Sequence, residues 1–253
     1  MRNKVYPSMD AAVADIQDGS SIMIGGFGPG SPHNLIVALH RQGAKNLTTI
    51  SNGTGGQGVG APRQYDLSIL FQARRVRKAL CAFTASPHPS RLSAFSEQYE
   101  KGEIEAELMP QGTLAERIRA AGAGIPAFYT PASVDTELAE GKEHRVFNGR
   151  TYVLEEALSA DYAFVRAWKA DKFGNLIFRR SQRNFNPLMA TAARCTIVEV
   201  EEPILEVGSL DPDQIHTPGI FVHRIVHIPP PPEGILDSPY NMPSQQPAVP
   251  GQR

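Results

Sequence analysis

The stretch Ser21 to Gly43, SIMIGGFGPGSPHNLIVALHRQG, decides the fold class. Its first residues, Ser21 to Gly26, form a short apolar run of the kind that makes a strand buried on both faces. A glycine-rich turn follows. Ser31 and Pro32 then predict the start of a helix, with serine as the N-cap and proline at the first position. The helix ends at the glycine at position 43. Its apolar positions are Leu35, Ile36 and Leu39.

The same alternation of strand and helix continues to about residue 130. Apolar runs predict four further strands. Thr113 to Ala121 predicts a helix, because Thr113 and Glu116 have the spacing of a capping box. Strands and helices that alternate in this way form a parallel sheet. The expected strands are Leu47 to Ser51, Val76 to Phe83, Ile104 to Leu108 and Ile125 to Tyr129.

The second half of the chain has a looser pattern. The Asn-Gly pair inside Val146 to Leu154 is a strong hairpin signal, and a second hairpin is expected around Lys172 to Asn175. Pro187 to Arg194 is typical of a helix, and Cys195 to Val200 is typical of a buried strand. We therefore expect an α/β fold: an open, mostly parallel sheet flanked by helices, with β-hairpin additions in the second half.

The length of the chain allows one large domain or two small ones. The chain has 253 residues, of which 41% are hydrophobic, enough for a sizeable core. We expect a single α/β domain over residues 1–228. A Pro-rich tail that is extended or disordered follows over residues 229–253, because it has no apolar periodicity.

The charge balance restricts the partners. Because 25 basic residues stand against 26 acidic ones, we expect no nucleic-acid partner, which would require a basic surplus. No apolar run approaches the roughly 20 residues that span a bilayer. The first residues also lack the apolar region of a signal peptide. We therefore expect a cytoplasmic protein with no membrane partner.

The glycine-rich loop Gly25 to Pro32 is the strongest candidate for a ligand site from residue types alone. A loop between a strand and a helix can present backbone N–H groups and a helix N-terminus to an anion. A tight structural turn is the alternative. The dinucleotide-binding fingerprint fails because Ser31 occupies the third glycine position and Pro29 interrupts the pattern. The histidines and cysteines form no paired ligand motif, so no metal site is expected.

Several longer blocks carry a more specific signal. In Asp18 to Pro32, an acidic-Gly pair and an apolar triplet lead into Gly-Gly-Phe. Leu47 to Gly56 contains a strand and an Asn loop, and Met109 to Pro131 is the strongest block. In this order the blocks resemble the A subunit of class I (3-oxoacid) CoA-transferases, from about residue 3 to residue 227. The resemblance implies an open α/β sheet of the CoA-transferase (NagB/RpiA-like) type.

The resemblance also implies a reaction and a partner. Enzymes of this family move CoA from an acyl-CoA donor to a free carboxylate, through a thioester on an enzyme glutamate. That glutamate lies in a Ser-Glu-Asn-Gly motif of the B subunit, and this sequence contains no such motif. We therefore expect the partner to be a CoA-transferase B subunit, in an AB heterodimer or an A2B2 assembly. The small-molecule partners would be an acyl-CoA and a carboxylate. A coenzyme A thioester is expected as substrate, and no tightly bound cofactor.

By the same resemblance, this chain supplies the electrostatic half of the active site. Gln111 and Asn52 are the candidate catalytic residues, since each follows a predicted strand and can donate a hydrogen bond to an oxyanion. The alternatives are an Asx turn at Asn52 and a helix cap at Gln111. In the family a second Asn stands where this chain has glycine, at position 53. The candidate substrate- and CoA-binding residues are Gly26, Phe27, Gly28, Gly30, Gly53, Gly122 and Gly124.

Two further pairs of polar residues lie beside predicted elements of the second half. Asn184 and Asn186 either hold the second half of the sheet against the site or form a turn before Pro187. Glu201 and Glu202 follow a predicted strand, and we expect them to be solvated charges at its end.

The acceptor expected from the resemblance is 3-oxoadipate or acetoacetate, with succinyl-CoA as donor. Two alternatives stay open. One is a subunit of a CoA-transferase-like hydrolase that acts on a cyclic CoA thioester. The other is a CoA-binding subunit without turnover.

Overall fold

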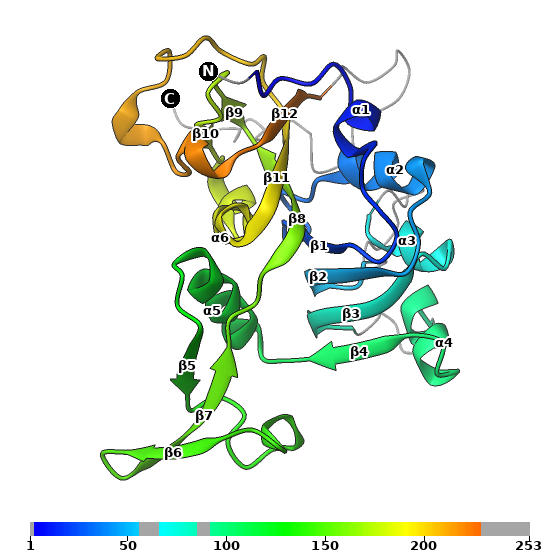
Figure 1. Ribbon diagram of the computed structural model, residues 1–253, viewed down its shortest axis with the longest axis vertical. Coiled ribbons are helices and arrows are strands. Elements are labelled where there is room, and N and C mark those ends of the chain that lie inside the picture. The colour runs from blue at the N-terminus through cyan, green and yellow to red at the C-terminus, as the bar shows by residue number, and fades with distance from the viewer. Residues whose placement is uncertain (1–2, 56–65, 85–91, 229–253) are drawn as a thin grey trace, which may run out of the picture.

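A seven-stranded sheet forms the centre of the computed structural model, which describes residues 3–55, 66–84 and 92–228 (Figure 1). The strand order is β12-β11-β8-β1-β2-β3-β4, and every neighbouring pair is parallel. The expected open parallel sheet is therefore confirmed. The strands are β1 (Ser21–Ile24), β2 (Leu47–Gly53), β3 (Val76–Phe83), β4 (Glu105–Leu108), β8 (Ala160–Ala167), β11 (Ala193–Val200) and β12 (Arg224–His227).

Helices cover both faces of this sheet, and each face has its own core. Strand β1 contributes side chains to both cores, because successive residues of a strand point to opposite faces. Ile22 and Ile24 lie in the core on one face, and Met23 lies in the core on the other. Burying each such side chain stabilises the fold by about 1.5–3 kcal/mol. The first face is covered by α1 (Met9–Val13), α2 (His33–Gln42), α3 (Ser68–Gln72) and α4 (Ala94–Glu100). The second face is covered by α5 (Gln111–Gly122) and α6 (Asn186–Ala192).

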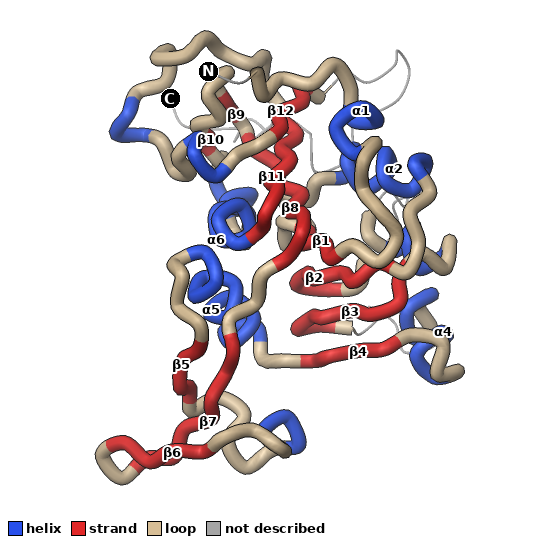
Figure 2. Tube along the Cα trace, viewed as in Figure 1, coloured by secondary structure: helices blue, strands red, loops and turns tan. Residues whose placement is uncertain are grey.

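Two smaller antiparallel sheets come from the second half of the chain (Figure 2). In the first, Asn148 and Gly149 both have positive φ, the conformation that a two-residue hairpin turn requires. Both expected hairpins are confirmed. The three-stranded sheet contains β5 (Ala127–Thr130), β6 (His144–Phe147) and β7 (Arg150–Glu156), and the two-stranded one contains β9 (Lys169–Ala170) and β10 (Leu176–Ile177). Short 3-10 helices are η1 (Glu137–Ala139), η2 (Arg180–Arg183), η3 (Pro212–Gln214) and η4 (Gly219–Phe221).

The expected strand near Ile125 to Tyr129 does not join the parallel sheet. It forms β5, which pairs antiparallel with β7, so that Tyr129 lies opposite Leu154. A four-residue apolar run does not indicate which strand it will pair with. Strand β7 lies further along the chain and pairs with β5 in the antiparallel direction. The parallel sheet is instead extended by β8, between β1 and β11.

The expected caps of two helices are also wrong. Helix α2 has Pro32 as N-cap with no side-chain cap bond, so Ser31 does not cap it. Helix α5 begins at Gln111 after Pro110, which leaves Thr113 buried inside the first turn rather than at the cap. In both cases the fixed φ of proline sets the entry into the helix, and the first N–H groups must find partners elsewhere.

Two glycines of α5 provide a test of the packing between α5 and α6. A Cβ added at Gly122 would lie 2.1 Å from Thr191 Oγ1 and 2.9 Å from Thr191 Cβ, whereas one at Gly112 meets nothing within 4 Å. Gly122→Ala should therefore lower the free energy of unfolding by about 1–3 kcal/mol through overpacking. The matched control Gly112→Ala should raise it by about 0.5–1 kcal/mol, because alanine is the better helix former. Denaturant unfolding measures both, and equal effects would contradict the close packing.

Candidate active site

The carboxyl ends of the parallel strands bring the candidate residues to one edge of the sheet. Ile24 at the end of β1 pairs with Ser51 of β2, and Cys81 of β3 pairs with both Ser51 and Leu108 of β4. The glycine loop, Asn52 and the start of α5 therefore follow neighbouring strands on the same side (Figure 1). Ligands bind at this edge in open α/β sheets.

Asn52 and Gln111 contact each other across this edge. The Gln111 Nε2 atom donates a hydrogen bond to Asn52 Oδ1 at 2.6 Å, although the residues lie 59 positions apart in the chain. Asn52 is only 8% exposed, whereas Gln111 is exposed. The bond occupies the Asn52 oxygen, so the free polar groups of the pair include amide N–H donors.

Neither alternative role fits this geometry. Asn52 lies within β2, which continues to Gly53, and therefore does not begin an Asx turn. Gln111 is the first residue of α5, but its side chain binds Asn52 instead of capping the helix. Their role in stabilising an oxyanion stays a prediction.

The glycine loop has a packed base and an open tip. Gly26 and Gly30 are buried with positive φ. A Cβ would lie 2.5 Å from Ser31 Oγ at Gly26 and 2.5 Å from the Gln182 carbonyl oxygen at Gly30. At Gly28 it would meet nothing within 4 Å, and Phe27 is 52% exposed. The tip at Phe27 and Gly28 is therefore the part of this loop that a ligand can reach.

The remaining candidate glycines divide between the two ends of α5. Gly53 pairs with Phe83 at the carboxyl edge, close to Asn52 in the chain. Gly122 ends α5, and a 12-residue helix with a rise of 1.5 Å per residue places it about 16 Å from Gln111. There it packs on Thr191, and Gly124 follows with positive φ. The structure thus does not bring Gly122 and Gly124 to the Asn52–Gln111 pair, and their contact with substrate stays a prediction.

The two asparagines near the start of α6 hold the glycine loop. Asn184 Nδ2 donates to the Pro29 carbonyl oxygen at 2.9 Å, and the buried Asn186 Nδ2 donates to that of Gly30 at 3.0 Å. The Asn186 Oδ1 atom accepts from the backbone N–H of Arg166 at 3.1 Å. The side chains therefore tie α6 and β8 to the loop after β1, a more specific role than either expectation from the sequence.

Glu199 is a functional candidate that the sequence reasoning missed. This fully buried residue of β11 accepts hydrogen bonds through Oε2 from the backbone N–H groups of Asn34 at 2.9 Å and Leu35 at 3.0 Å. It thereby replaces the cap that Pro32 cannot provide at the start of α2. The available signal was a glutamate inside a strand predicted to be buried, since a charge at such a position requires partners.

Arg166 balances the charge of Glu199 and reaches a second carboxylate. Its Nη1 atom lies 3.4 Å from Glu199 Oε1, and its Nε atom donates to Glu201 Oε1 at 2.8 Å. Gln182 Nε2 also donates to Glu201, at 3.0 Å. The expectation that Glu201 is a solvated charge is therefore wrong, because this side chain is mostly covered and ion-paired. Glu202 is exposed, as expected.

The N–H groups at the start of α2, which were expected to bind a substrate anion, already have partners within the chain. The N–H of His33 donates to the Ser31 carbonyl oxygen at 3.0 Å, and the next two N–H groups donate to Glu199. The protein's own carboxylate thus occupies the position where a substrate anion was expected. Burial raises the pKa of Glu199 to about 7, although Arg166 and the N–H groups favour the ionised form.

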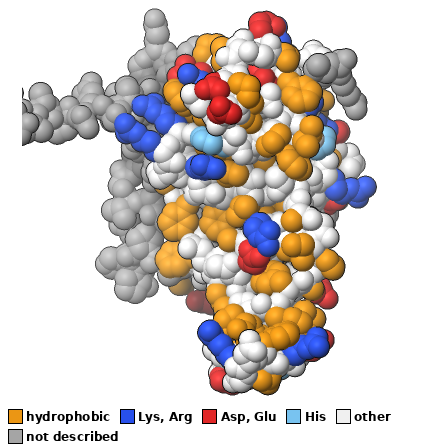
Figure 3. All heavy atoms as spheres, turned by 90° about the vertical axis from the view of Figure 1, so that its left-hand side faces the viewer, with side chains coloured by type: hydrophobic (Ala, Val, Ile, Leu, Met, Phe, Trp, Pro, Cys, Tyr) orange, Lys and Arg blue, Asp and Glu red, His pale blue; other side chains and the backbone are white. Residues whose placement is uncertain are grey.

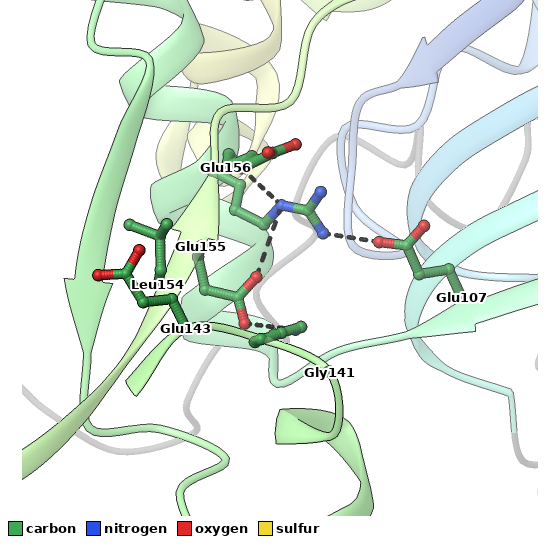
Figure 4. Close-up of a pocket in the computed structure, with 8 residues that line it drawn as sticks. Glu107, Gly141, Glu143, Leu154, Glu155 and Glu156 are labelled. Atoms are coloured by element: carbon green, nitrogen blue, oxygen red, sulfur yellow. Dashed lines mark hydrogen bonds and ion pairs between the residues drawn. The ribbon is translucent and has the colours of Figure 1, made fainter. Parts of the chain in front are cut away.

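A hollow of about 300 Å³ lies between β4, α5 and the three-stranded sheet (Figure 4). Four of its charged side chains pair with one another: Arg117 Nη1 donates to Glu107 at 2.8 Å, and Lys142 Nζ donates to the buried Glu155 at 2.7 Å. The Nε atom of Arg117 donates to the Glu156 carbonyl oxygen. These contacts join the small sheet to the body of the molecule.

The described ranges also bear on metals and membranes. Within them, no group of histidine, cysteine, aspartate and glutamate side chains is arranged to hold a metal ion. No helix in these ranges has the length and apolar character to cross a membrane.

Comparison with known proteins gives the family. A model of the coenzyme A transferase family matches residues 6–227. The chain belongs to this family. It is 49% identical to the A subunit of a probable succinyl-CoA:3-ketoacid coenzyme A transferase of Bacillus subtilis, over 88% of this chain and 89% of the relative. It is also 49% identical to the A subunit of the 3-oxoadipate CoA-transferase of Pseudomonas putida, over 90% of this chain and 95% of the relative.

Solved structures of CoA-transferases have the same fold. An acyl-CoA transferase from E. coli O157:H7, solved as a thioester complex with CoA, superposes with a TM-score of 0.73 at 25% identity. The match covers 90% of this chain and 47% of the E. coli chain. The present chain therefore spans about half the length of the E. coli protein. Glutaconate coenzyme A-transferase from Acidaminococcus fermentans gives a TM-score of 0.74 at 22% identity, over 89% of this chain and 76% of that one.

The raised pKa of Glu199 predicts a pH dependence of stability. The pKa in the folded chain, about 7, lies above the usual 4.5, so the folded state binds this proton more tightly than the unfolded state. The resulting stabilisation is complete below about pH 4.5 and is lost as the pH rises through about 7. Glu199→Gln has no such group. Denaturant unfolding between about pH 5 and pH 8 should show the wild-type chain losing roughly 2–3 kcal/mol relative to the variant. Parallel pH profiles would mean that Glu199 is ionised throughout this range.

Proposed function

We propose that this chain is the A subunit of a succinyl-CoA:3-oxoacid CoA-transferase with acetoacetate or 3-oxoadipate as acceptor. The observation that carries the proposal is the 49% identity, over most of both chains, to relatives named as the A subunits of two such enzymes. The two relatives are equally similar, and their names differ in the acceptor. An assay with each acceptor is therefore needed to decide between acetoacetate and 3-oxoadipate.

The reaction needs hydrogen-bond donors at an oxygen that becomes negative. Transfer of an acyl group between CoA and a carboxylate proceeds by attack on a carbonyl carbon, which places negative charge on the carbonyl oxygen. In the proposed site, Gln111 directs an amide N–H at this oxygen. Asn52, which accepts a hydrogen bond from the Gln111 side chain at 2.6 Å, orients that amide. A neutral amide can do this without the desolvation penalty of a buried charge.

The proposal places the nucleophilic glutamate on a partner, the B subunit, in an AB heterodimer or an A2B2 assembly. Exposed apolar side chains at the carboxyl edge support a partner there: Phe27 is 52% exposed, Phe83 47% and Leu108 44%. Figure 3 shows the molecule from the side to which the parallel strands β2, β3 and β4 point in Figure 1. Hydrophobic side chains spread over much of that face. Exposed apolar surface of this kind is typical of an interaction site.

The test of the function is reconstitution. The chain alone should show no CoA transfer, because it lacks the motif that carries the glutamate nucleophile. Co-expression with a candidate B subunit from the neighbouring gene should give transfer from succinyl-CoA to acetoacetate or to 3-oxoadipate. Transfer by a preparation of this chain alone, retained through re-purification, would contradict the need for a partner. A purified complex inactive on both acceptors would contradict the substrate assignment.

Gln111 is the residue whose replacement tests the site. Removing one oxyanion donor typically lowers kcat by about 10²–10³-fold, so Gln111→Ala should have this effect in the reconstituted complex. Gln111→Glu should be at least as inactive, since a carboxylate repels the developing charge. Assembly should be unchanged, because the side chain is exposed and its bond to Asn52 is the contact that the substitution removes.

A matched control comes from the same helix. Glu116→Ala removes a charged α5 side chain that is paired with Arg119 on the surface, and it should leave kcat unchanged. If both Gln111 variants assemble and keep the kcat of the wild type, the oxyanion role belongs to other groups, such as backbone N–H groups.

A further inference from the structure

A carboxylate buried across the sheet controls the start of α2. Helix α2 follows the glycine loop directly, and its N-cap is Pro32, which offers no side-chain acceptor. The first N–H groups of a helix need partners. Glu199 supplies them from β11, 165 positions further along the chain, and its Oε1 atom also accepts from Asn34 Nδ2 at 3.3 Å. The end of the glycine loop is therefore fixed by a side chain that belongs to the other half of the sheet.

The hydrogen-bond donors around Glu199 favour its ionised form against the cost of burial. Along the sheet its neighbours are Arg166 on β8 and the apolar Val226 on β12. Three groups of α2 donate hydrogen bonds to the Glu199 carboxylate: the backbone N–H groups of Asn34 and Leu35, and the side-chain amide of Asn34. Arg166 in turn reaches Glu201, on its other side. A carboxylate with two oxygens can accept all of these donors at once, whereas a glutamine has one oxygen and would turn its NH2 group toward other donors.

The same network holds the loop at a second point. The backbone N–H of Arg166 donates to Asn186, whose Nδ2 atom donates to the Gly30 carbonyl oxygen at 3.0 Å. Gly30 and the start of α2 thus enclose the end of the loop. Asn186 of α6, itself bound to β8, holds Gly30, and Glu199 of β11 holds the start of α2. The open tip at Phe27 and Gly28 projects from this base.

The geometry points to Glu199 as a positioning residue for CoA transfer: by capping α2 from β11, and with Arg166 beside it, it sets the glycine loop at the correct distance from the Asn52–Gln111 pair. Glu199 itself is fully buried and does not touch substrate. This inference rests on the proposed function, since the effect on turnover is measured as CoA transfer. The effect on the loop is independent of it.

The experiment compares Glu199→Gln with Asp15→Asn. Asp15 also pairs with an arginine, Arg224, through bonds of 2.6 and 2.7 Å. Arg224 is the first residue of the edge strand β12, where it pairs with Ile197 of β11, and its bonds to Asp15 involve no N–H group of α2. Hydrogen–deuterium exchange of the isolated chain should show that the glutamine variant loses protection at Asn34 and Leu35. The Asp15 variant should keep it. In the reconstituted complex, Glu199→Gln should lower kcat about 10-fold or more, since bonds to a charged group are weakened. The KM for succinyl-CoA should stay unchanged, and the Asp15 variant should keep the wild-type kcat.

Several results would overturn the inference. One is unchanged protection at Asn34 and Leu35 in Glu199→Gln, and another is a wild-type kcat in that variant. An equal loss of kcat in the Glu199 and Asp15 variants would indicate general destabilisation instead. Glu199→Ala should act more strongly, and if it does not fold, the glutamine variant decides. If the wild-type complex transfers no CoA, the proposed function fails. A loss of protection would in that case still identify the cap, but not a role in transfer.

Discussion

The parallel pairing of β1 with β8 is the contact on which the rest of the structure depends. It joins Met23 to Ala163 and Ile24 to Phe164, and so unites two halves of the chain that are each a small parallel sheet. Without it, no strand of β12-β11-β8 would pair with a strand of β1-β2-β3-β4. Because of it, the glycine loop after β1 lies close to Glu199 of β11 and to Asn186 of α6, whose side chains hold the end of the loop and the start of α2.

The candidate site separates neutral groups from charged ones. At the exposed edge, two amides face each other, and neither requires a counter-ion. Behind it, the buried Arg166 and Glu199 form an ion pair that holds the backbone. Breaking a buried pair by removing one partner is strongly destabilising, whereas well-packed apolar residues often do as well as the pair itself. The pair is thus better explained by what it positions than by the stability it adds.

Local patterns predicted the elements well wherever a short segment contains all the information. The strand Val76–Phe83, the two hairpins and the helix near residue 187 follow from apolar runs and turn residues. The contact between Asn52 and Gln111 was foreseeable in part, because both follow strands of one parallel sheet. The caps of α2 and α5 were not, since proline at each entry excludes the usual local cap and the true partner of α2 lies on β11.

The sequence by itself determined the family, the parallel sheet and the residues at its carboxyl edge, because periodicity, turn residues and motifs are properties of contiguous segments. The tertiary structure alone decided that β5 leaves the sheet, that Gly122 packs on Thr191, and that Glu199 caps α2. Each of these depends on which distant segments become neighbours. A buried polar group takes the partner that the folded chain brings within about 3 Å, whatever its distance along the sequence.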